Sequence, residues 1–171
     1  QKFLLTKMSA NTRIIVVDNV LELDYVELNP NIDLNIWQAD EEKPQNTIQS
    51  LIKNALRCNP DWLIAAEARG EEMVDVLNSA LTGHPIITTI HAFDCESMPT
   101  RMTRMVMMGN RKADYEDIYQ DISYHLRIYV YLKRKILKDG TVFRYISKIN
   151  YLSGKAWKPI YKFDKKQEYF Q

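Results

Sequence analysis

The 171-residue chain contains only two cysteines, and no apolar run in it approaches the ~20 residues of a membrane-spanning helix. Cys58 and Cys95 are too few for a disulfide framework and suit a reducing compartment. No signal peptide, internal repeat or low-complexity segment is visible. These absences exclude a disulfide-stapled scaffold and a membrane-spanning helix within this stretch of sequence.

Glycine is also scarce, and its five positions are isolated from one another: Gly70, Gly83, Gly109, Gly140 and Gly154. A phosphate-binding loop of the form GxxxxGK[ST] uses glycines so that backbone N–H groups can approach the phosphates closely. No such run occurs in the 171 residues. This stretch therefore contains no phosphate loop.

The composition is that of an ordinary globular chain, with 46% apolar and 26% charged residues. Its length suits one domain with a sizeable core. The formal net charge of +1 conceals an asymmetry, because residues 1–110 sum to −6 and residues 111–171 to +7. Two solvated faces would explain this asymmetry, and so would contacts with another subunit, anionic lipid or nucleic acid.

The most informative stretch is residues 60–92, PDWLIAAEARGEEMVDVLNSALTGHPIITTIHA. Its apolar run 62–66 predicts a buried parallel strand that ends immediately before Glu67. A helix with an apolar stripe follows, and residues 86–91 predict a second strand carrying Thr89 and His91. Thr88 and Thr89 should point to opposite faces, so only Thr89 is expected on the side of His91. Ligands bind at the carboxyl edge of such sheets.

The remaining pattern predicts an α/β unit followed by an antiparallel meander. We expect strands at 13–18 and 34–38. We expect four helices: one at 2–9, one that begins after Thr47, one that begins at Ser97 and runs through Met108, and one at 115–126. Phe3, Leu4 and Met8 should form the apolar side of the first helix. In the tail, apolar and polar residues alternate loosely at 127–137 and 141–152, which predicts two strands. A third strand at 157–163 and a last short strand at 167–170 should follow.

Several of these segments carry a family resemblance. PDWLIAAEARG resembles the Walker B segment of the secretion ATPases, the motors of type II and type IV secretion and of pili, and TGHPIITTIHA resembles their His box. RMTRMVMM and VVDNVLEL are similar to two further family patterns, the latter to the Asp box. DGTVFRYISKINYL resembles the C-terminal hairpin of the tight-adherence branch. Linked matches in one order are far more specific than a single short motif.

The resemblance implies a RecA-like P-loop NTPase core, a mostly parallel sheet flanked by helices, at residues 1–126. An antiparallel β extension at 127–171 would pack on the same domain. It further implies that the stretch is the C-terminal part of a hexameric ATPase powering secretion, pilus assembly or conjugative transfer. Because the phosphate loop and the family's N-terminal domain are lacking, these residues alone should bind ATP and Mg²⁺ weakly or not at all and should not turn ATP over.

The same resemblance assigns site residues. Glu67 would position the attacking water or hold Mg²⁺ through water, and Asp18 and Glu22 would support it. The nucleotide-sensing residues would be His91, Thr89, His84, Arg69 and Arg101. On pattern alone, a structural ion pair between Glu67 and Arg69 is the simpler interpretation.

The Asp box departs from the family pattern. Asp18 stands where the family has glutamate, and Asn19 where it has aspartate. The carboxylate of Asp18 is therefore set back by roughly 1.5 Å, and a water would have to bridge it to a metal. This departure favours a first alternative, a non-hydrolysing subunit with an assembly role.

A second alternative is a RecA-like nucleic-acid translocase, since basic and tyrosine residues alternate in the tail. The resemblance itself implies a homo-hexamer at the cytoplasmic side of the inner membrane, acting on a membrane platform protein, with no nucleic-acid partner. The spacings of Cys58, Cys95, His84 and His91 fit no structural zinc pattern.

Overall fold

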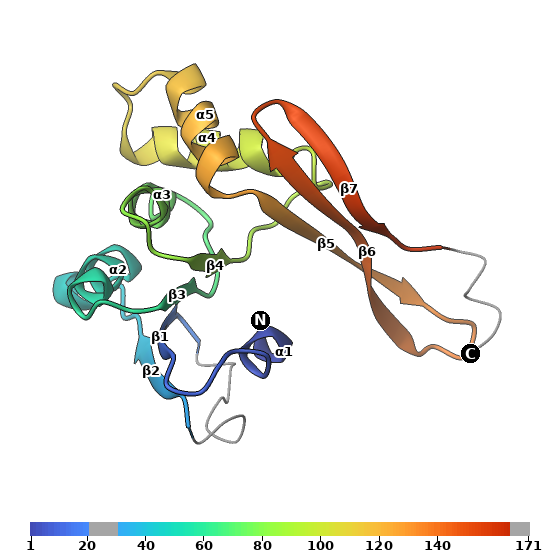
Figure 1. Cartoon of the computed structure of the whole chain (residues 1–171), viewed down its shortest axis with the longest axis horizontal. Coiled ribbons are helices and arrows are strands. Elements are labelled where there is room, and N and C mark those ends of the chain that lie inside the picture. Colours follow the sequence, from blue (N-terminus) through green and yellow to red (C-terminus); the bar gives the residue numbers. More distant parts are fainter. Residues whose placement is uncertain (21–30, 165–171) are drawn as a thin grey trace. The chain divides into compact units, whose positions relative to one another are not determined.

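The computed structural model describes residues 1–20 and 31–164. The chain divides into two compact units, Gln1–His91 with Arg104–Ala113, and Ala92–Thr103 with Asp114–Gln171, and each is described by itself below (Figure 1). Among the described residues, no helix has the length and apolar character needed to cross a membrane. The short strand expected at residues 167–170 lies outside the described residues.

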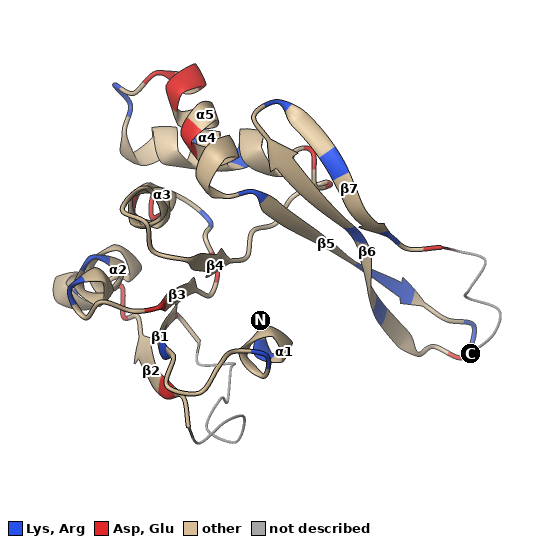
Figure 2. Ribbon diagram, in the orientation of Figure 1, with Lys and Arg blue, Asp and Glu red and all other residues tan. Residues whose placement is uncertain are grey.

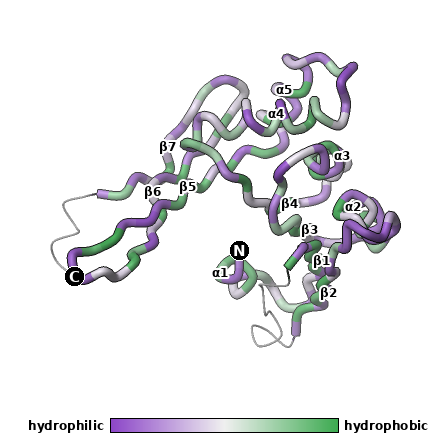
Figure 3. Tube along the Cα trace, turned by 180° about the vertical axis from the view of Figure 1, so that it is seen from behind, coloured by the Kyte–Doolittle hydropathy of each residue, from purple (hydrophilic) through white to green (hydrophobic). Residues whose placement is uncertain are grey.

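The first unit is built on a four-stranded parallel sheet of order β2-β1-β3-β4. Its strands are β1 (Arg13–Asp18), β2 (Asp33–Gln38), β3 (Trp62–Ala65) and β4 (Ile86–Thr88). The hydrophobic stretches of β1 and β3 are visible in Figure 3, as expected for central strands covered on both faces. The predicted parallel α/β core is confirmed, although β4 ends at Thr88, three residues earlier than expected.

Two helices, α2 (Ile48–Arg57) and α3 (Met73–Leu81), lie on one face of this sheet (Figure 1). A short 3-10 turn, η1 (Pro44–Asn46), precedes α2, and the hydroxyl of Thr47 accepts a hydrogen bond from the amide of Ser50. This is the predicted N-cap, which satisfies a backbone donor that the first helical turn leaves unpaired.

The opposite face is covered by α1 (Lys2–Leu5), which is much shorter than the predicted helix 2–9. The hydroxyl of Thr6 bonds to the carbonyl of Phe3, a local bond that competes with helix continuation. Consequently the side chain that enters the core is Leu5, against Ile14, Val16 and Ile64, with Met8 partly buried beside them. Phe3 is 71% exposed, so the predicted apolar side of this helix was wrong.

Helix α4 (Met98–Gly109) contributes its last six residues to the first unit. Gly109 is the last residue of α4, and a Cβ there would come within 2.8 Å of Val74 and 3.1 Å of Glu71. Val74 is β-branched and cannot easily move aside. The absence of a side chain thus lets the end of α4 approach the start of α3.

The second unit contains the first half of α4, helix α5 (Tyr115–His125) and the antiparallel sheet β5-β6-β7. Its strands are β5 (Ile128–Ile136), β6 (Val142–Ser153) and β7 (Ala156–Lys162). Gly140 and Gly154 occupy the two connecting turns with φ of 85° and 60°, values that glycine adopts most easily. The predicted meander is confirmed, and Figure 2 shows that the basic charge of the tail is spread over its strands.

Candidate active site

Polar side chains gather where three strands of the parallel sheet end. Asp18 is the last residue of β1, Glu67 follows the end of β3 by two residues, and Thr89 follows β4 directly. Parallel strands bring their carboxyl ends to the same edge, so these residues share a cavity of about 200 Å³. The residues lining it are Gln1, Val17, Asp18, Asn19, Val20, Ile48, Ala66, Glu67, Arg69 and Thr89.

Glu67 makes two unequal contacts through its carboxylate. Its Oε2 lies 2.7 Å from a terminal nitrogen of Arg69, and its Oε1 lies 3.3 Å from His91 Nε2. The adjacency of Glu67 and His91 that the strand order predicts is therefore present. Oε1 is buried and, apart from this contact with His91, has no hydrogen-bond partner among the described residues.

The environment keeps Glu67 ionised. The hydrogen bond from Arg69 is the main cause that lowers the pKa of Glu67, and the charges of Arg69 and His91 act in the same direction. Burial opposes them and raises the pKa, but by less. The structural ion pair considered from the sequence thus exists, and the second oxygen of Glu67 faces His91.

Replacing Arg69 should raise the pKa of Glu67, because the largest cause of its depression is lost. We expect Arg69→Met to move the pKa of the Glu67 carboxyl up from below 4.5, as measured by ¹³C NMR titration of the glutamate carboxyl carbons. A depressed carboxyl pKa stabilises the fold above the unfolded-state value, and this contribution disappears as the pH falls through the folded-state value.

Arg69→Met should therefore reduce the free energy of unfolding at neutral pH only slightly, because the Arg69 side chain is 69% exposed. The difference from the wild type should vanish in acid. Arg57→Met, at the end of α2, serves as the control and should leave the Glu67 titration unchanged. An unchanged Glu67 pKa in Arg69→Met would contradict the ion pair.

Asp18 lies in the same cavity but is more enclosed. It is 9% exposed, and its Oδ1 accepts a hydrogen bond of 3.3 Å from the amide of Val20. The carboxylates of Asp18 and Glu67 are thus brought to one cavity, as the sequence predicts. Glu22, the third expected acid, lies outside the described residues.

Two of the expected sensing residues in the first unit, His91 and His84, do not line this cavity, although His91 contacts Glu67. The ring Nδ1 of His84 lies 3.1 Å from the hydroxyl of Thr82, within the turn that follows α3. Arg101 is exposed and belongs to the second unit. Among the described residues of the first unit no contact joins His84 to Glu67, and the role expected for Arg101 stays a prediction.

Thr89 and Gln1 both bond to the backbone beside Glu67. The hydroxyl of Thr89 and the side-chain amide of Gln1 donate to the carbonyl of Ala66, over 2.5 Å and 3.0 Å respectively. Thr89 lies beyond the end of β4, so the expectation based on strand alternation between Thr89 and His91 does not apply. Sequence reasoning missed Gln1, because no local pattern signals a contact across 65 positions.

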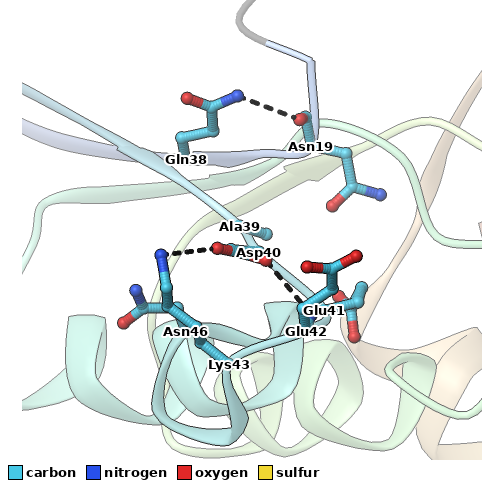
Figure 4. Close-up of a pocket in the computed structure, with 8 residues that line it drawn as sticks. All are labelled: Asn19, Gln38, Ala39, Asp40, Glu41, Glu42, Lys43 and Asn46. Carbon is cyan, nitrogen blue, oxygen red and sulfur yellow. Dashed lines mark hydrogen bonds and ion pairs between the residues drawn. The ribbon is translucent and has the colours of Figure 1, made fainter.

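A wider hollow of about 590 Å³ lies beside the end of β2 (Figure 4). It is lined by Asn19, Gln38, Ala39, Asp40, Glu41, Glu42, Lys43 and Asn46. Asp40 pairs with Lys43 over 2.9 Å and accepts the amide of Glu42, while Glu41 accepts the amide of Ile48. These carboxylates are used to form the turn and to cap α2. We therefore assign the carboxylates of Asp40 and Glu41 a structural role, in the turn and at the start of α2.

Within residues 1–20 and 31–164, no cluster of three or more His, Cys, Asp or Glu side chains is placed to hold a metal ion. Cys58 is exposed and Cys95 is buried. Burial raises the pKa of the Cys95 thiol to about 11, so this cysteine is protonated at neutral pH.

A parallel sheet flanked by helices is the architecture of a RecA-like core, and comparison with solved structures agrees. The crystal structure of the VirB11 ATPase from the Brucella suis type IV secretion system, in complex with sulphate, superimposes with a TM-score of 0.73 at 30% identity, covering 88% of this chain and 43% of that chain. The Legionella pneumophila ATPase DotB gives a TM-score of 0.62 at 22% identity, covering 80% and 36%.

The chain belongs to the type II/IV secretion system protein family, whose model matches residues 2–130. In sequence, an uncharacterized protein of Bacillus anthracis is 29% identical over 86% of this chain and 34% of its own length. The type IV secretion system protein VirB11 of Brucella suis is 30% identical over 88% of this chain and 42% of its own length. The chain thus spans less than half of the length of these relatives, and the predicted membership of the secretion ATPase family is confirmed.

Proposed function

We propose that, in the complete protein, this chain forms the C-terminal part of an ATPase that powers protein secretion, pilus assembly or conjugative transfer. The observation that carries the proposal is the carboxylate of Glu67, held at the end of β3 in a cavity with Asp18, with Oε2 bonded to Arg69 and Oε1 lying 3.3 Å from His91. An ionised carboxylate at this position can accept a hydrogen bond from a water and orient it for attack on a phosphoryl group.

The size of the cavity fits the proposal that these residues form only a part of the nucleotide-binding site. Sites that enclose whole small molecules typically measure ~300–1,000 Å³, and this cavity has about 200 Å³. It can receive a terminal phosphate and a water, while the rest of ATP would be bound by parts of the protein beyond these 171 residues. The sulphate bound to VirB11, an anion of similar shape to phosphate, supports this proposal.

The donor set is compatible with Mg²⁺. This ion is commonly held by one or two carboxylates together with substrate phosphates and waters, and Asp18 and Glu67 provide two carboxylates in one cavity. When bound, Mg²⁺ would neutralise the negative charge of the phosphates. The roles of this chain's own residues do not depend on a metal cage, which fits the absence of a three-ligand cluster in the described ranges.

Arg69 and His91 are the residues that would respond to a phosphate. Both side chains are largely exposed and contact Glu67, so either can turn toward an incoming anion. Release of Arg69 would raise the basicity of Glu67, since this arginine is the main cause of its lowered pKa. His84, Arg101 and the undescribed Glu22 stay in the proposal as sensing or supporting residues on the family resemblance alone.

The complete protein would act as a homo-hexamer at the cytoplasmic face of the inner membrane, passing motion to a membrane platform protein. Support comes from the family itself, since VirB11 is a component of a type IV secretion system. Rigid-body rotation of domains is the usual way in which such motors convert hydrolysis into movement.

The test is ATP hydrolysis by the complete protein. We expect phosphate release that requires Mg²⁺ and stops when EDTA is added, measured with a coupled phosphate assay. Retained ATP binding without release would instead establish the non-hydrolysing assembly subunit. Release stimulated by single-stranded DNA in a salt-sensitive manner would favour the translocase.

A further inference from the structure

The backbone of Ala66, the residue immediately before Glu67, makes three hydrogen bonds. The amide of Ala66 donates to the carbonyl of Val17 over 2.9 Å, and its carbonyl accepts both the Thr89 hydroxyl and the Gln1 amide. On the other side of Glu67, the amide of Ala68 donates to the carbonyl of Thr89 over 2.9 Å. Thr89 therefore bonds to the residue before Glu67 and to the residue after it.

These bonds lie where the regular sheet has already ended. The pairing of β3 with β4 finishes at Ala65 and Thr88, so no ladder bond positions the backbone of Glu67. The bonds of Thr89 to Ala66 and Ala68 continue the connection between the segments that follow β3 and β4. They fix the backbone from which the Glu67 side chain projects into the cavity.

We propose that Thr89 is a positioning residue for Glu67 and that its hydroxyl acts through the Ala66 carbonyl. This inference rests on the proposed function of Glu67. It differs from the nucleotide-sensing role expected for Thr89 from the sequence, because the hydroxyl proton is donated to Ala66. A shift of about 1 Å in a catalytic group can cost as much as ~10²-fold in rate, so the geometry of this peptide matters for turnover.

The neighbouring Thr88 provides a matched control. Its Oγ1 is buried and has no hydrogen-bond partner in the part of the chain that the structure describes. A valine has nearly the same shape as threonine, so Thr88→Val removes a hydroxyl without removing a bond. Thr89→Val makes the same chemical change one residue later and removes the bond to Ala66.

The experiment compares steady-state ATP hydrolysis by the complete wild-type protein with its Thr89→Val, Thr89→Ser, Thr88→Val and Glu67→Gln variants. For Thr89→Val we expect kcat to fall about 10- to 100-fold with KM nearly unchanged, because the acid is displaced while nucleotide binding is not. Thr89→Ser keeps a hydroxyl and should restore most of kcat. Thr88→Val should resemble the wild type, and thermal unfolding of each variant checks that it is folded.

Three results would overturn the inference. One is a Thr89→Val kcat equal to that of the wild type, and another is a raised KM at constant kcat, which indicates a nucleotide contact. The third is an equal loss in Thr89→Ser and Thr89→Val, which rules out the hydroxyl. Full turnover in Glu67→Gln would instead refute the proposed role of Glu67. If Glu67→Gln is inactive while Thr89→Val is fully active, only the positioning role fails.

Discussion

Glu67→Gln in the complete protein should abolish ATP turnover while ATP binding is retained. Glutamine keeps the size of the side chain and a carbonyl oxygen, but it has no charge and cannot take up a proton from water. Loss of a general base typically reduces the rate by ~10²- to 10⁴-fold, equivalent to about 3–5 kcal/mol in the barrier. Phosphate release and equilibrium binding of a fluorescent ATP analogue measure the two effects separately.

Glu71→Gln is the matched control for this prediction. It makes the same change of charge four positions away, at an exposed side chain, and should leave kcat within the error of the assay. If Glu67→Gln turned over ATP as fast as the wild type, Glu67 would have no part in the chemistry. Equal losses in both variants would point to general electrostatics instead of a positioned carboxylate.

Ile64→Ala should destabilise the first unit by about 2–5 kcal/mol, a large part of the ~5–15 kcal/mol that stabilises a typical domain. Ile64 is completely buried and central in β3, where it pairs in register with Val16 on β1 and Ile87 on β4. Its truncation removes apolar contacts on the α1 face and leaves a cavity that rigid strands cannot fill. Amide hydrogen exchange of β1 and β3 reports this unit separately from the second.

Leu4→Ala is the control, since Leu4 is 46% exposed and its truncation should change the free energy of unfolding by less than ~0.5 kcal/mol. Ile64→Val should reduce the free energy of unfolding by about 0.5–1.5 kcal/mol, a loss between those expected for Leu4→Ala and Ile64→Ala. A loss below ~1 kcal/mol for Ile64→Ala would mean that the core between the sheet and α1 is not formed as described.

The strand and helix pattern of the chain was predictable because hydrophobic periodicity is a local property. Continuous apolar runs indicated β1 and β3, and the helical stripe after Thr47 indicated α2, with its cap. The hairpins of the second unit followed from turn residues between alternating segments. Helix α1 was predicted too long, because a side-chain bond from Thr6 to the backbone decides where it ends.

The adjacency of Glu67 and His91 was also within reach of the sequence. Consecutive strands of a βαβ unit are parallel, so residues that follow two neighbouring strands meet at one edge, whatever the details of packing. The roles expected for these residues came from motifs, and motifs carry no geometry. How the carboxylate is divided between Arg69 and His91 therefore had to come from the coordinates.

By itself, the sequence determined the family, the parallel core and the set of acids at its carboxyl edge, because these depend on residue type and on order along the chain. Only the tertiary structure decided that Thr89 and Gln1 bond to the Ala66 carbonyl and that the two oxygens of Glu67 face Arg69 and His91. The reason is physical: a hydrogen bond depends on tenths of an ångström between segments far apart in sequence, and such distances are set by the packing of the whole unit.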